Sequence, residues 1–166
     1  IKKTEEKIEN KSSDGLRMNI INKTINNIPK KVIIDYAHTP DGLKKLLQTM
    51  KKIYQGKILL VFGCGGDRDK GKRKLMGNVA NHYADFVCIT NDNPRNENPN
   101  QIADQICEDI SCLKKIILDR KKAIEYAIKK TNYPIVVIAG KGHEKYQIIK
   151  NKKIDFSDKK VVMDIN

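Results

Sequence analysis

The chain has 166 residues and a mass of 18.9 kDa, which suits one compact domain with its own core and is too short for two large ones. Hydrophobic residues make up 39% and charged residues 32%, a composition typical of a globular protein. No apolar run approaches the roughly 18 residues of a membrane-spanning helix, and residues 1–6 contain no secretory signal. We therefore expect a cytoplasmic protein without membrane contact, and the first residue, Ile1, suggests a fragment or a processed product.

The formal net charge of +13 raises the question of nucleic-acid binding, because clustered Lys and Arg neutralise phosphates. The chain contains 28 Lys, 15 Asn and 24 Ile, and all three residues have A/T-rich codons, so genome composition explains most of the lysine excess. Only 5 of the 33 basic residues are Arg, the side chain best suited to bidentate phosphate and guanine recognition. We therefore interpret the lysines as a solvated surface and expect no nucleic-acid partner.

The cysteines and histidines do not follow a metal-binding pattern. No C-x-x-C pair is present, and the histidines lie far from zinc-finger spacing, so we expect no metal site. Cys88 lies in an apolar run and Cys107 on a predicted helix face, as in reduced cytoplasmic proteins. The residues concerned are Cys64, Cys88, Cys107, Cys112, His38, His82 and His143.

Residues 1–16 are polar and charged, so we expect a linker or the end of a preceding domain there, followed by one domain over 17–166. From Lys31 onward, strand and helix patterns alternate. The predicted strands are 31–36, 57–62, 86–90, 115–118 and 134–139, followed by a hairpin of 146–149 and 152–155.

Helices are predicted after each of the first four strands, where apolar residues recur every three or four positions. Thr39 and Pro40 are an N-cap and a first helical residue, and Asp119 and Ser157 are predicted to cap two later helices. The apolar stripe of the first helix is Leu43, Leu46, Leu47, Met50, Ile53 and Tyr54, and that of the second is Leu75, Met76, Val79, Ala80 and Tyr83.

Repeated strand–helix units with short connections predict an α/β fold, a Rossmann-like, mostly parallel sheet with helices on both faces and a C-terminal hairpin. Ligands of such folds bind at the carboxyl ends of the strands. The unusual polar motifs all follow predicted strands, at 35–41, 63–72, 91–95 and 140–144. The sequence therefore predicts a ligand site at that edge of the sheet.

The motif G-C-G-G-D-R-D-K-G over 63–71 places glycines, acids and bases in a strand-to-helix turn, where backbone N–H groups can hold an anion. It is not a dinucleotide fingerprint, because Arg68 stands where that pattern needs Gly, and no Walker A loop occurs in the chain. A tight turn with solvated charges is the alternative.

Two further motifs carry candidate binding groups. In D-N-P-R, Pro94 restricts the backbone and Arg95 can clamp a carboxylate with two parallel hydrogen bonds, although a plain turn has the same sequence. G-K-G-H-E is not a zinc-protease helix, because Gln147 occupies the place of the second His. The segment 35–41 could hold a ribose or a metal-bound phosphate, or simply begin a helix.

Together the strings D-Y-A-H-T-P-D-G-L, G-C-G-G-D-R-D-K-G-K-R, D-N-P-R and G-K-G-H-E-x-Y-Q are far more specific than any one of them. In this order and spacing they resemble the C-terminal domain of the Mur ligase family, from Arg17 to the end of the chain. They are most similar to the members that add meso-diaminopimelate to UDP-N-acetylmuramoyl-L-alanyl-D-glutamate in peptidoglycan synthesis.

The resemblance implies an ATP-dependent ligase that converts the D-glutamate γ-carboxylate to an acyl phosphate, which the amine of the third amino acid then attacks. Mg²⁺ would neutralise phosphate charge. In the family the C-terminal domain supplies the amino-acid pocket, whereas ATP is bound mainly by a central domain. We expect a monomeric ligase of which this chain is one part. The resemblance implies that this chain is inactive alone, and we expect no catalytic residue and no metal ligand in it.

The resemblance also implies roles for individual residues. Arg68 would contact a carboxylate of diaminopimelate, and Arg95 the distal carboxylate that lysine lacks. Glu144 would face the distal ammonium group. The substrate-binding set implied is Arg68, Asp92, Asn93, Pro94, Arg95, Gly140 and Glu144, and the set on the ATP side is Asp35, Arg17 and His38.

Three alternatives remain open. A ligase selective for another amino acid is disfavoured by D-N-P-R, because lysine has no distal carboxylate for Arg95 to bind. A stand-alone or remnant binding module without catalysis is the second alternative. A nucleic-acid-binding domain, the third, is disfavoured by the few Arg residues and the lack of interleaved aromatic residues.

Overall fold

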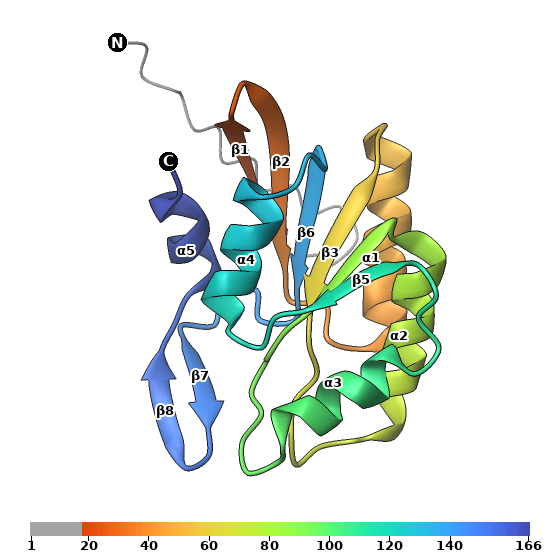
Figure 1. Cartoon of the computed structure of the whole chain (residues 1–166), viewed down its shortest axis with the longest axis vertical. Helices are drawn as coiled ribbons and strands as arrows, with labels where there is room; N and C mark the ends of the chain where they lie inside the picture. The colour runs from red at the N-terminus through yellow and green to blue at the C-terminus, as the bar shows by residue number, and fades with distance from the viewer. Residues whose placement is uncertain (1–17) are drawn as a thin grey trace.

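A six-stranded sheet in the order β1-β2-β6-β3-β4-β5 forms the centre of the computed structural model, which describes residues 18–166 (Figure 1). β1 is antiparallel to β2, and every other neighbouring pair is parallel. This confirms the predicted mostly parallel α/β sheet. The strands are β1 (Asn19–Ile25), β2 (Ile28–Asp35), β3 (Ile58–Phe62), β4 (Phe86–Ile89), β5 (Leu113–Ile116) and β6 (Ile135–Ala139).

Helices cover both faces of this sheet, so each face has its own hydrophobic core. The central strands β3 and β6 are buried at every position, as expected for parallel strands covered twice. One face packs against α1 (Pro40–Ile53), α2 (Gly71–Tyr83) and α3 (Pro99–Cys107), and the other against α4 (Arg120–Lys129) and α5 (Asp158–Asp164). Within residues 18–166, no helix has the length and apolar character needed to cross a membrane.

The predicted helix caps are confirmed. Thr39 Oγ1 accepts a hydrogen bond from Gly42 N at 3.0 Å, and Asp119 Oδ1 accepts one from Lys122 N at 3.0 Å. Ser157 Oγ accepts in the same way from Lys160 N. Each cap satisfies a backbone donor that the first helical turn leaves unpaired, which explains why the helices begin where the sequence predicts.

The hairpin of β1 and β2 was not predicted, because the alternation of strand and helix patterns begins only at Lys31. Ile25 pairs with Ile28 across a two-residue turn in which Asn26 and Asn27 have φ angles of +51° and +64°. Asparagine tolerates this left-handed conformation, and two positive φ angles match the twist of a tight hairpin. The Asn-Asn pair between two isoleucine-rich runs was therefore a usable signal.

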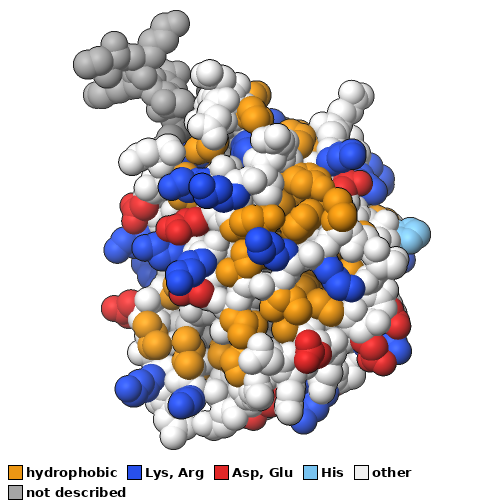
Figure 2. Space-filling model, viewed as in Figure 1, with side chains coloured by type: hydrophobic (Ala, Val, Ile, Leu, Met, Phe, Trp, Pro, Cys, Tyr) orange, Lys and Arg blue, Asp and Glu red, His pale blue; other side chains and the backbone are white. Residues whose placement is uncertain are grey.

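Other predictions were wrong in detail. The fourth strand is Leu113–Ile116 rather than 115–118. Its pairing with β4 begins at Leu113 and ends at Ile116, whereas the apolar run continues beyond Ile116. Ile53 and Leu75, predicted as core residues, are 54% and 55% exposed. Ile53 is the last residue of α1, and α2 turns Met76 inward in place of Leu75. Apolar side chains also reach the surface on the face shown in Figure 2, among lysines.

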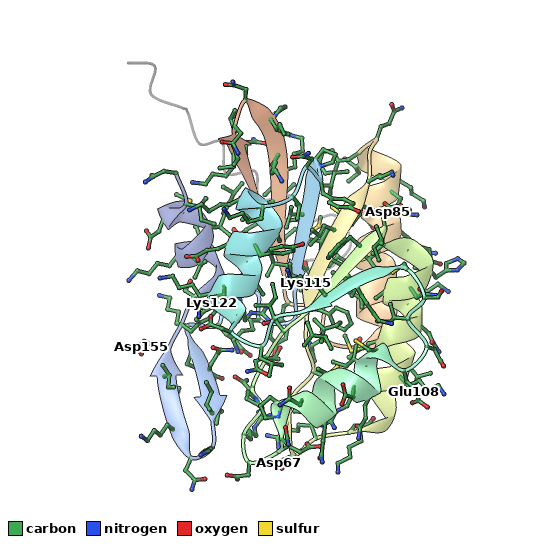
Figure 3. The ribbon with its side chains drawn as sticks, viewed as in Figure 1. Asp67, Asp85, Glu108, Lys115, Lys122 and Asp155 are labelled. Atoms are coloured by element: carbon green, nitrogen blue, oxygen red, sulfur yellow. The ribbon has the colours of Figure 1, made fainter. Side chains whose placement is uncertain are left out.

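The predicted C-terminal hairpin is confirmed as β7 (Tyr146–Ile149) and β8 (Lys152–Asp155), which form a separate two-stranded sheet. β7 lies beside the loop that follows β4, where Arg95 forms an isolated bridge with Ile149. Asp67, after β3, and Asp85, before β4, lie at opposite ends of the main sheet, and the hairpin lies toward the end of Asp67 (Figure 3). The predicted linker 1–16 and Arg17 lie outside the described residues.

Candidate functional site

A cleft of about 370 Å³ lies at the carboxyl ends of the parallel strands, between the loops that follow β2, β3, β4 and β6. It brings together six residues predicted from separate motifs, namely His38, Arg68, Asp92, Asn93, Arg95 and Glu144. Tyr36, Cys64 and Lys72 also line it and were not predicted. Convergence of four loops on one cleft is the arrangement expected of a ligand site in an open parallel sheet.

Pro94, Gly140 and Asp35 do not line this cleft. Pro94 is buried. Gly140 has a φ of +114°, and a Cβ at this position would lie 2.8 Å from Asp92 Oδ2. Gly140 therefore leaves room for the Asp92 carboxylate, which a residue with a side chain would displace.

Asp35 is buried at the end of β2, at 2% exposure. Its Oδ1 accepts a hydrogen bond from Ala37 N at 2.8 Å, whereas its buried Oδ2 has no hydrogen-bond partner among the described residues. Burial raises the pKa of this carboxyl group. His38 lies closer to the solvent, with Nδ1 2.9 Å from Tyr36 O and its own carbonyl oxygen accepting from Lys72 Nζ.

The loop of 92–95 presents Arg95 to the cleft in an unusual backbone conformation, with φ at +51°. Its Nη1 donates to Gly66 O at 2.9 Å and makes a longer contact of 3.4 Å with Asn93 O. Nε and Nη2 have no partner within residues 18–166. The guanidinium group is thus held at one nitrogen, and its remaining N–H groups can donate to an anion.

β7 holds this loop in place. Ile148 O accepts from Arg95 N at 3.1 Å, and Lys150 N donates to Arg95 O at 2.8 Å. Gln147 Nε2 donates to Asp92 O at 2.8 Å. The C-terminal hairpin therefore acts as an added strand that fixes the backbone carrying Asp92 and Arg95.

Three buried basic residues that the sequence analysis missed support the cleft from below. The first, Lys141, has no exposed surface, and its Nζ donates to Asn93 Oδ1 at 3.0 Å and to Glu144 Oε2 at 3.2 Å. Nζ also lies 3.7 Å from Asp92 Oδ1. A lysine between two glycines directly after a fully buried strand was the available signal.

The second, Arg73 on α2, joins the glycine loop to the loop after β4. Its Nη1 and Nη2 bind Glu97 Oε1 and Oε2, each at 2.7 Å, and Nη2 also donates to Gly65 O. This bidentate pair lowers the pKa of Glu97 to about 2. Glu97 Oε2 in turn accepts from Asp67 N, so the pair fixes the turn that carries Arg68.

The third, Arg120, forms a fully buried bidentate pair with Asp158 of α5, with distances of 2.7 and 2.8 Å. It also donates to Asn91 O and Ala139 O, the backbone oxygens from which two of the cleft loops depart. The pairing partner lies 38 residues away in sequence, so no local pattern could reveal it.

The electrostatics of the cleft favour binding over nucleophilic chemistry by its cysteine. Burial raises the pKa of Cys64 to about 12, so its thiol is protonated at neutral pH and is a poor nucleophile. Burial and the nearby carboxylates of Glu144 and Asp92 raise the pKa of Tyr36. Within residues 18–166, no three His, Cys, Asp or Glu side chains are grouped so that they could hold a metal ion.

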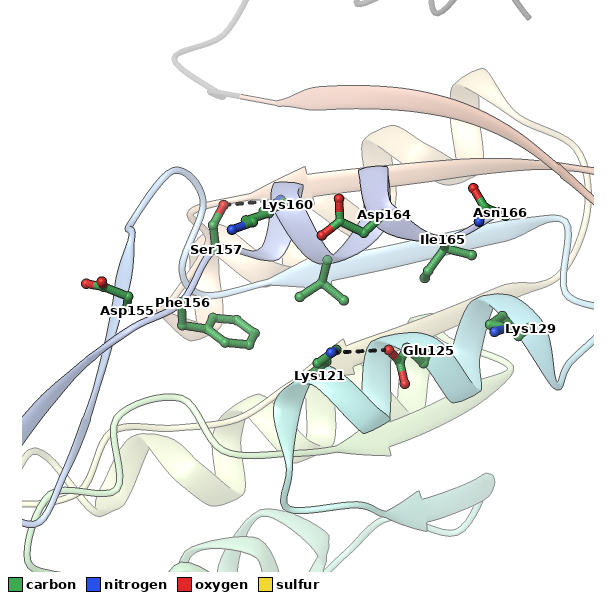
Figure 4. A pocket seen from close by; sticks show the side chains of 11 residues that line it. Lys121, Glu125, Lys129, Asp155, Phe156, Ser157, Lys160, Asp164, Ile165 and Asn166 are labelled. Carbon is green, nitrogen blue, oxygen red and sulfur yellow. Dashed lines mark hydrogen bonds and ion pairs between the residues drawn. The ribbon is translucent and has the colours of Figure 1, made fainter.

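A second hollow, of about 490 Å³, lies between α4 and α5 (Figure 4). Its rim carries charges of both signs, including the pair of Lys121 and Glu125 at 4.0 Å, and Phe156 also lines it. Of the residues predicted to bind substrate or ATP, none that the structure describes lines this hollow. This hollow is larger than the cleft. However, it does not lie where several loops converge, and none of the three buried basic residues that hold the cleft loops lines it.

Comparison with known proteins gives a consistent picture. The family profile described as "Mur ligase, glutamate ligase domain" matches residues 16–142. Over 133 residues the chain is 57% identical to the UDP-N-acetylmuramoyl-L-alanyl-D-glutamate–2,6-diaminopimelate ligase of Prochlorococcus marinus subsp. pastoris, covering 78% of this chain and 26% of that protein. The ligase of the same name from Buchnera aphidicola subsp. Schizaphis graminum is 56% identical over 138 residues, with 80% and 27% covered.

A solved structure of a UDP-N-acetylmuramoyl-L-alanyl-D-glutamate–2,6-diaminopimelate ligase superimposes with a TM-score of 0.80 at 41% identity, over 89% of this chain and 30% of that one. The chain spans about a quarter of the length of the curated relatives that it matches. The family profile covers most of the chain, including the loops after β2, β3 and β4 that form the cleft. This chain belongs to the Mur ligase family.

Proposed function

We propose that this chain is the C-terminal, amino-acid-binding domain, over residues 17–166, of an ATP-dependent ligase. The ligase adds meso-diaminopimelate to UDP-N-acetylmuramoyl-L-alanyl-D-glutamate in peptidoglycan synthesis. The relatives named for this activity support the proposal. The single observation that carries it is the meeting of Arg95, Asp92 and Glu144 in one cleft.

The charges of the cleft fit the proposed substrate. meso-Diaminopimelate carries a carboxylate and an ammonium group at each end, so its pocket needs cations and anions in alternation. Arg95 and Arg68 are the cations, and Asp92 and Glu144 are the anions. The free N–H groups of Arg95 would bind the distal carboxylate, and Glu144 the distal ammonium, while Asn93 holds the loop between them. Lysine would bind less well, because it would leave the half-buried Arg95 without a carboxylate.

The remaining parts of the reaction are assigned to the rest of the ligase. ATP would convert the γ-carboxylate of D-glutamate to an acyl phosphate, with Mg²⁺ neutralising phosphate charge. The described residues contain no cluster suited to a metal, so we assign Mg²⁺ to the domain that binds ATP. Asp35 and His38 are the candidates in this chain for contact with the nucleotide side, together with Arg17, which lies outside the described residues. The cleft's own role is to orient the attacking amine.

Calorimetric titration of the 166-residue chain with meso-diaminopimelate and with L-lysine tests the proposal. We expect meso-diaminopimelate to bind and L-lysine to bind at least tenfold more weakly, because lysine lacks the carboxylate assigned to Arg95. Equal affinity for the two amino acids, or no binding of meso-diaminopimelate, would contradict the proposed function.

A further inference from the structure

Lys141 lies directly beneath the residues proposed to bind the amino acid. It is fully buried and does not line the cleft. Its ammonium group nevertheless binds Asn93 and Glu144 and lies within 3.7 Å of Asp92. An ammonium group is costly to bury unless it is paired, and every polar partner of this one is a side chain of the cleft.

Asn93 connects Lys141 to Arg95. Its Oδ1 accepts two hydrogen bonds, one from Lys141 Nζ at 3.0 Å and one from Ile148 N at 2.9 Å. Its backbone oxygen accepts from Gly66 N at 2.8 Å. Because Asn93 is 6% exposed, losing one donor would leave a buried acceptor underused and free the side chain to move. A shift of Asn93 would carry Arg95, two residues later, with it.

Lys141 also supplies the positive charge among the acidic groups of the cleft floor. Asp92 and Glu144 both approach its ammonium group from the same cleft. Without that cation, the two carboxylates would repel each other and any further carboxylate brought by a ligand. The other two buried cations that support the cleft, Arg73 and Arg120, are already paired with Glu97 and Asp158.

We propose that Lys141 is a positioning residue for the amino-acid substrate, acting through Asn93 and Glu144 without touching the substrate itself. This inference rests on the proposed function, because it assigns to Lys141 the geometry of the diaminopimelate pocket. The role differs from a general contribution to stability, since it predicts an effect on binding that another buried lysine does not share.

The experiment compares Lys141→Met with Lys30→Met in the 166-residue chain. Lys30 is also buried, at 2% exposure, but its Nζ donates to Thr131 O at the opposite end of the sheet. Calorimetry measures the Kd for meso-diaminopimelate, thermal melting measures stability, and NMR follows the amide of Ile148, whose N–H binds Asn93.

We expect Lys141→Met to raise the Kd at least tenfold and to shift the Ile148 amide signal in the unliganded protein. Lys30→Met should lower the melting temperature comparably, with a Kd within twofold of the wild type and no shift at Ile148. If Lys141→Met does not fold, Lys141→Arg replaces it. The wider guanidinium keeps the charge but displaces Asn93, so the Kd should rise at least threefold.

The outcomes separate this inference from the function on which it rests. A wild-type chain that binds meso-diaminopimelate, with an unchanged Kd in the folded Lys141 variant, would overturn the positioning role alone. Equal losses of affinity in the Lys30 and Lys141 variants would also overturn it, because they would indicate a general loss of stability. A wild-type chain that binds no meso-diaminopimelate would overturn both.

Discussion

The α-carbon of Gly66 packs against the backbone oxygen of Pro94, so closely that a Cβ on Gly66 would lie 1.9 Å from that oxygen. Gly66 N also donates to Asn93 O at 2.8 Å. The glycine loop after β3 and the loop after β4 are thus joined backbone to backbone. This contact places Arg68 and Arg95 along the same cleft, although they belong to different motifs.

Gly66→Ala should therefore disrupt the cleft, because neither backbone can move away without breaking their hydrogen bond. We expect a loss of about 3 kcal/mol in the free energy of unfolding and no measurable binding of meso-diaminopimelate. Gly71→Ala is the matched control, since a Cβ there would lie 3.2 Å from the flexible side chain of Asp69 at the start of α2. Urea denaturation should show Gly71→Ala within about 0.5 kcal/mol of wild type. Equal effects of the two substitutions would contradict the backbone contact.

The ion pair of Arg73 and Glu97 should make stability depend on pH in the acid range. The pKa of Glu97 is lowered from 4.5 to about 2 in the folded state, chiefly by the hydrogen bonds from Arg73. A carboxyl group whose pKa is lower in the folded state than in the unfolded state stabilises the protein at pH values above its unfolded-state pKa. This contribution disappears as the pH falls from about 5 toward 2. Glu97→Gln should lose about 2 kcal/mol at pH 7 and show a shallower decline in stability between pH 5 and 3.

Denaturation curves at several pH values check this prediction. Glu108→Gln is the control, because Glu108 pairs with Lys74 at 3.5 Å and both side chains are about half exposed. Its stability curve should follow the wild type. A Glu97→Gln variant with the same acid dependence as the wild type would show that other carboxylates cause the decline.

Asp158→Asn should destabilise the chain strongly, since Arg120 would remain buried without its counter-charge. We expect a loss of about 3–5 kcal/mol in the free energy of unfolding, measured by chemical denaturation. Glu125→Gln removes the exposed pair with Lys121 on the same helix, α4, and should cost no more than about 0.5 kcal/mol. A small effect of Asp158→Asn would mean that water or another acceptor replaces the carboxylate.

Arg95→Ala tests the assigned selectivity in a complete ligase. A chimera would join the upstream part of the Prochlorococcus marinus relative to residues 18–166 of this chain. Arg95→Ala should raise KM for meso-diaminopimelate at least tenfold, because a charged bidentate contact contributes about 1.5–3 kcal/mol. KM for ATP should stay nearly unchanged. Lys145→Ala removes an exposed charge one residue after Glu144 and should change neither KM value. Steady-state kinetics with both substrates varied measures these values. A constant KM for meso-diaminopimelate in Arg95→Ala would contradict the role assigned to Arg95.

Much of the fold could be predicted because its signals are local. Helix caps such as Thr39 and Ser157 act on backbone groups three residues away, and apolar periodicity spans only a few turns. The strand at 115–118 was misplaced because the apolar run continues to Leu118, whereas the residues that pair with β4 end at Ile116. Apolar periodicity also failed to distinguish Leu75 from Met76, since adjacent apolar residues leave the buried face of a helix undecided.

The sequence by itself determined the kind of fold, the edge of the sheet where the candidate ligand site lies and the four motifs that carry polar groups to that edge. Only the tertiary structure decided how those motifs meet. β6 lies between β2 and β3, and this places Lys141 against Asn93, 48 residues earlier in the chain. The pairs of Arg73 with Glu97 and Arg120 with Asp158 arise in the same way. A buried charge is stable only when it is paired, and the strand order decides which residues lie close enough to pair. No local sequence pattern encodes that order.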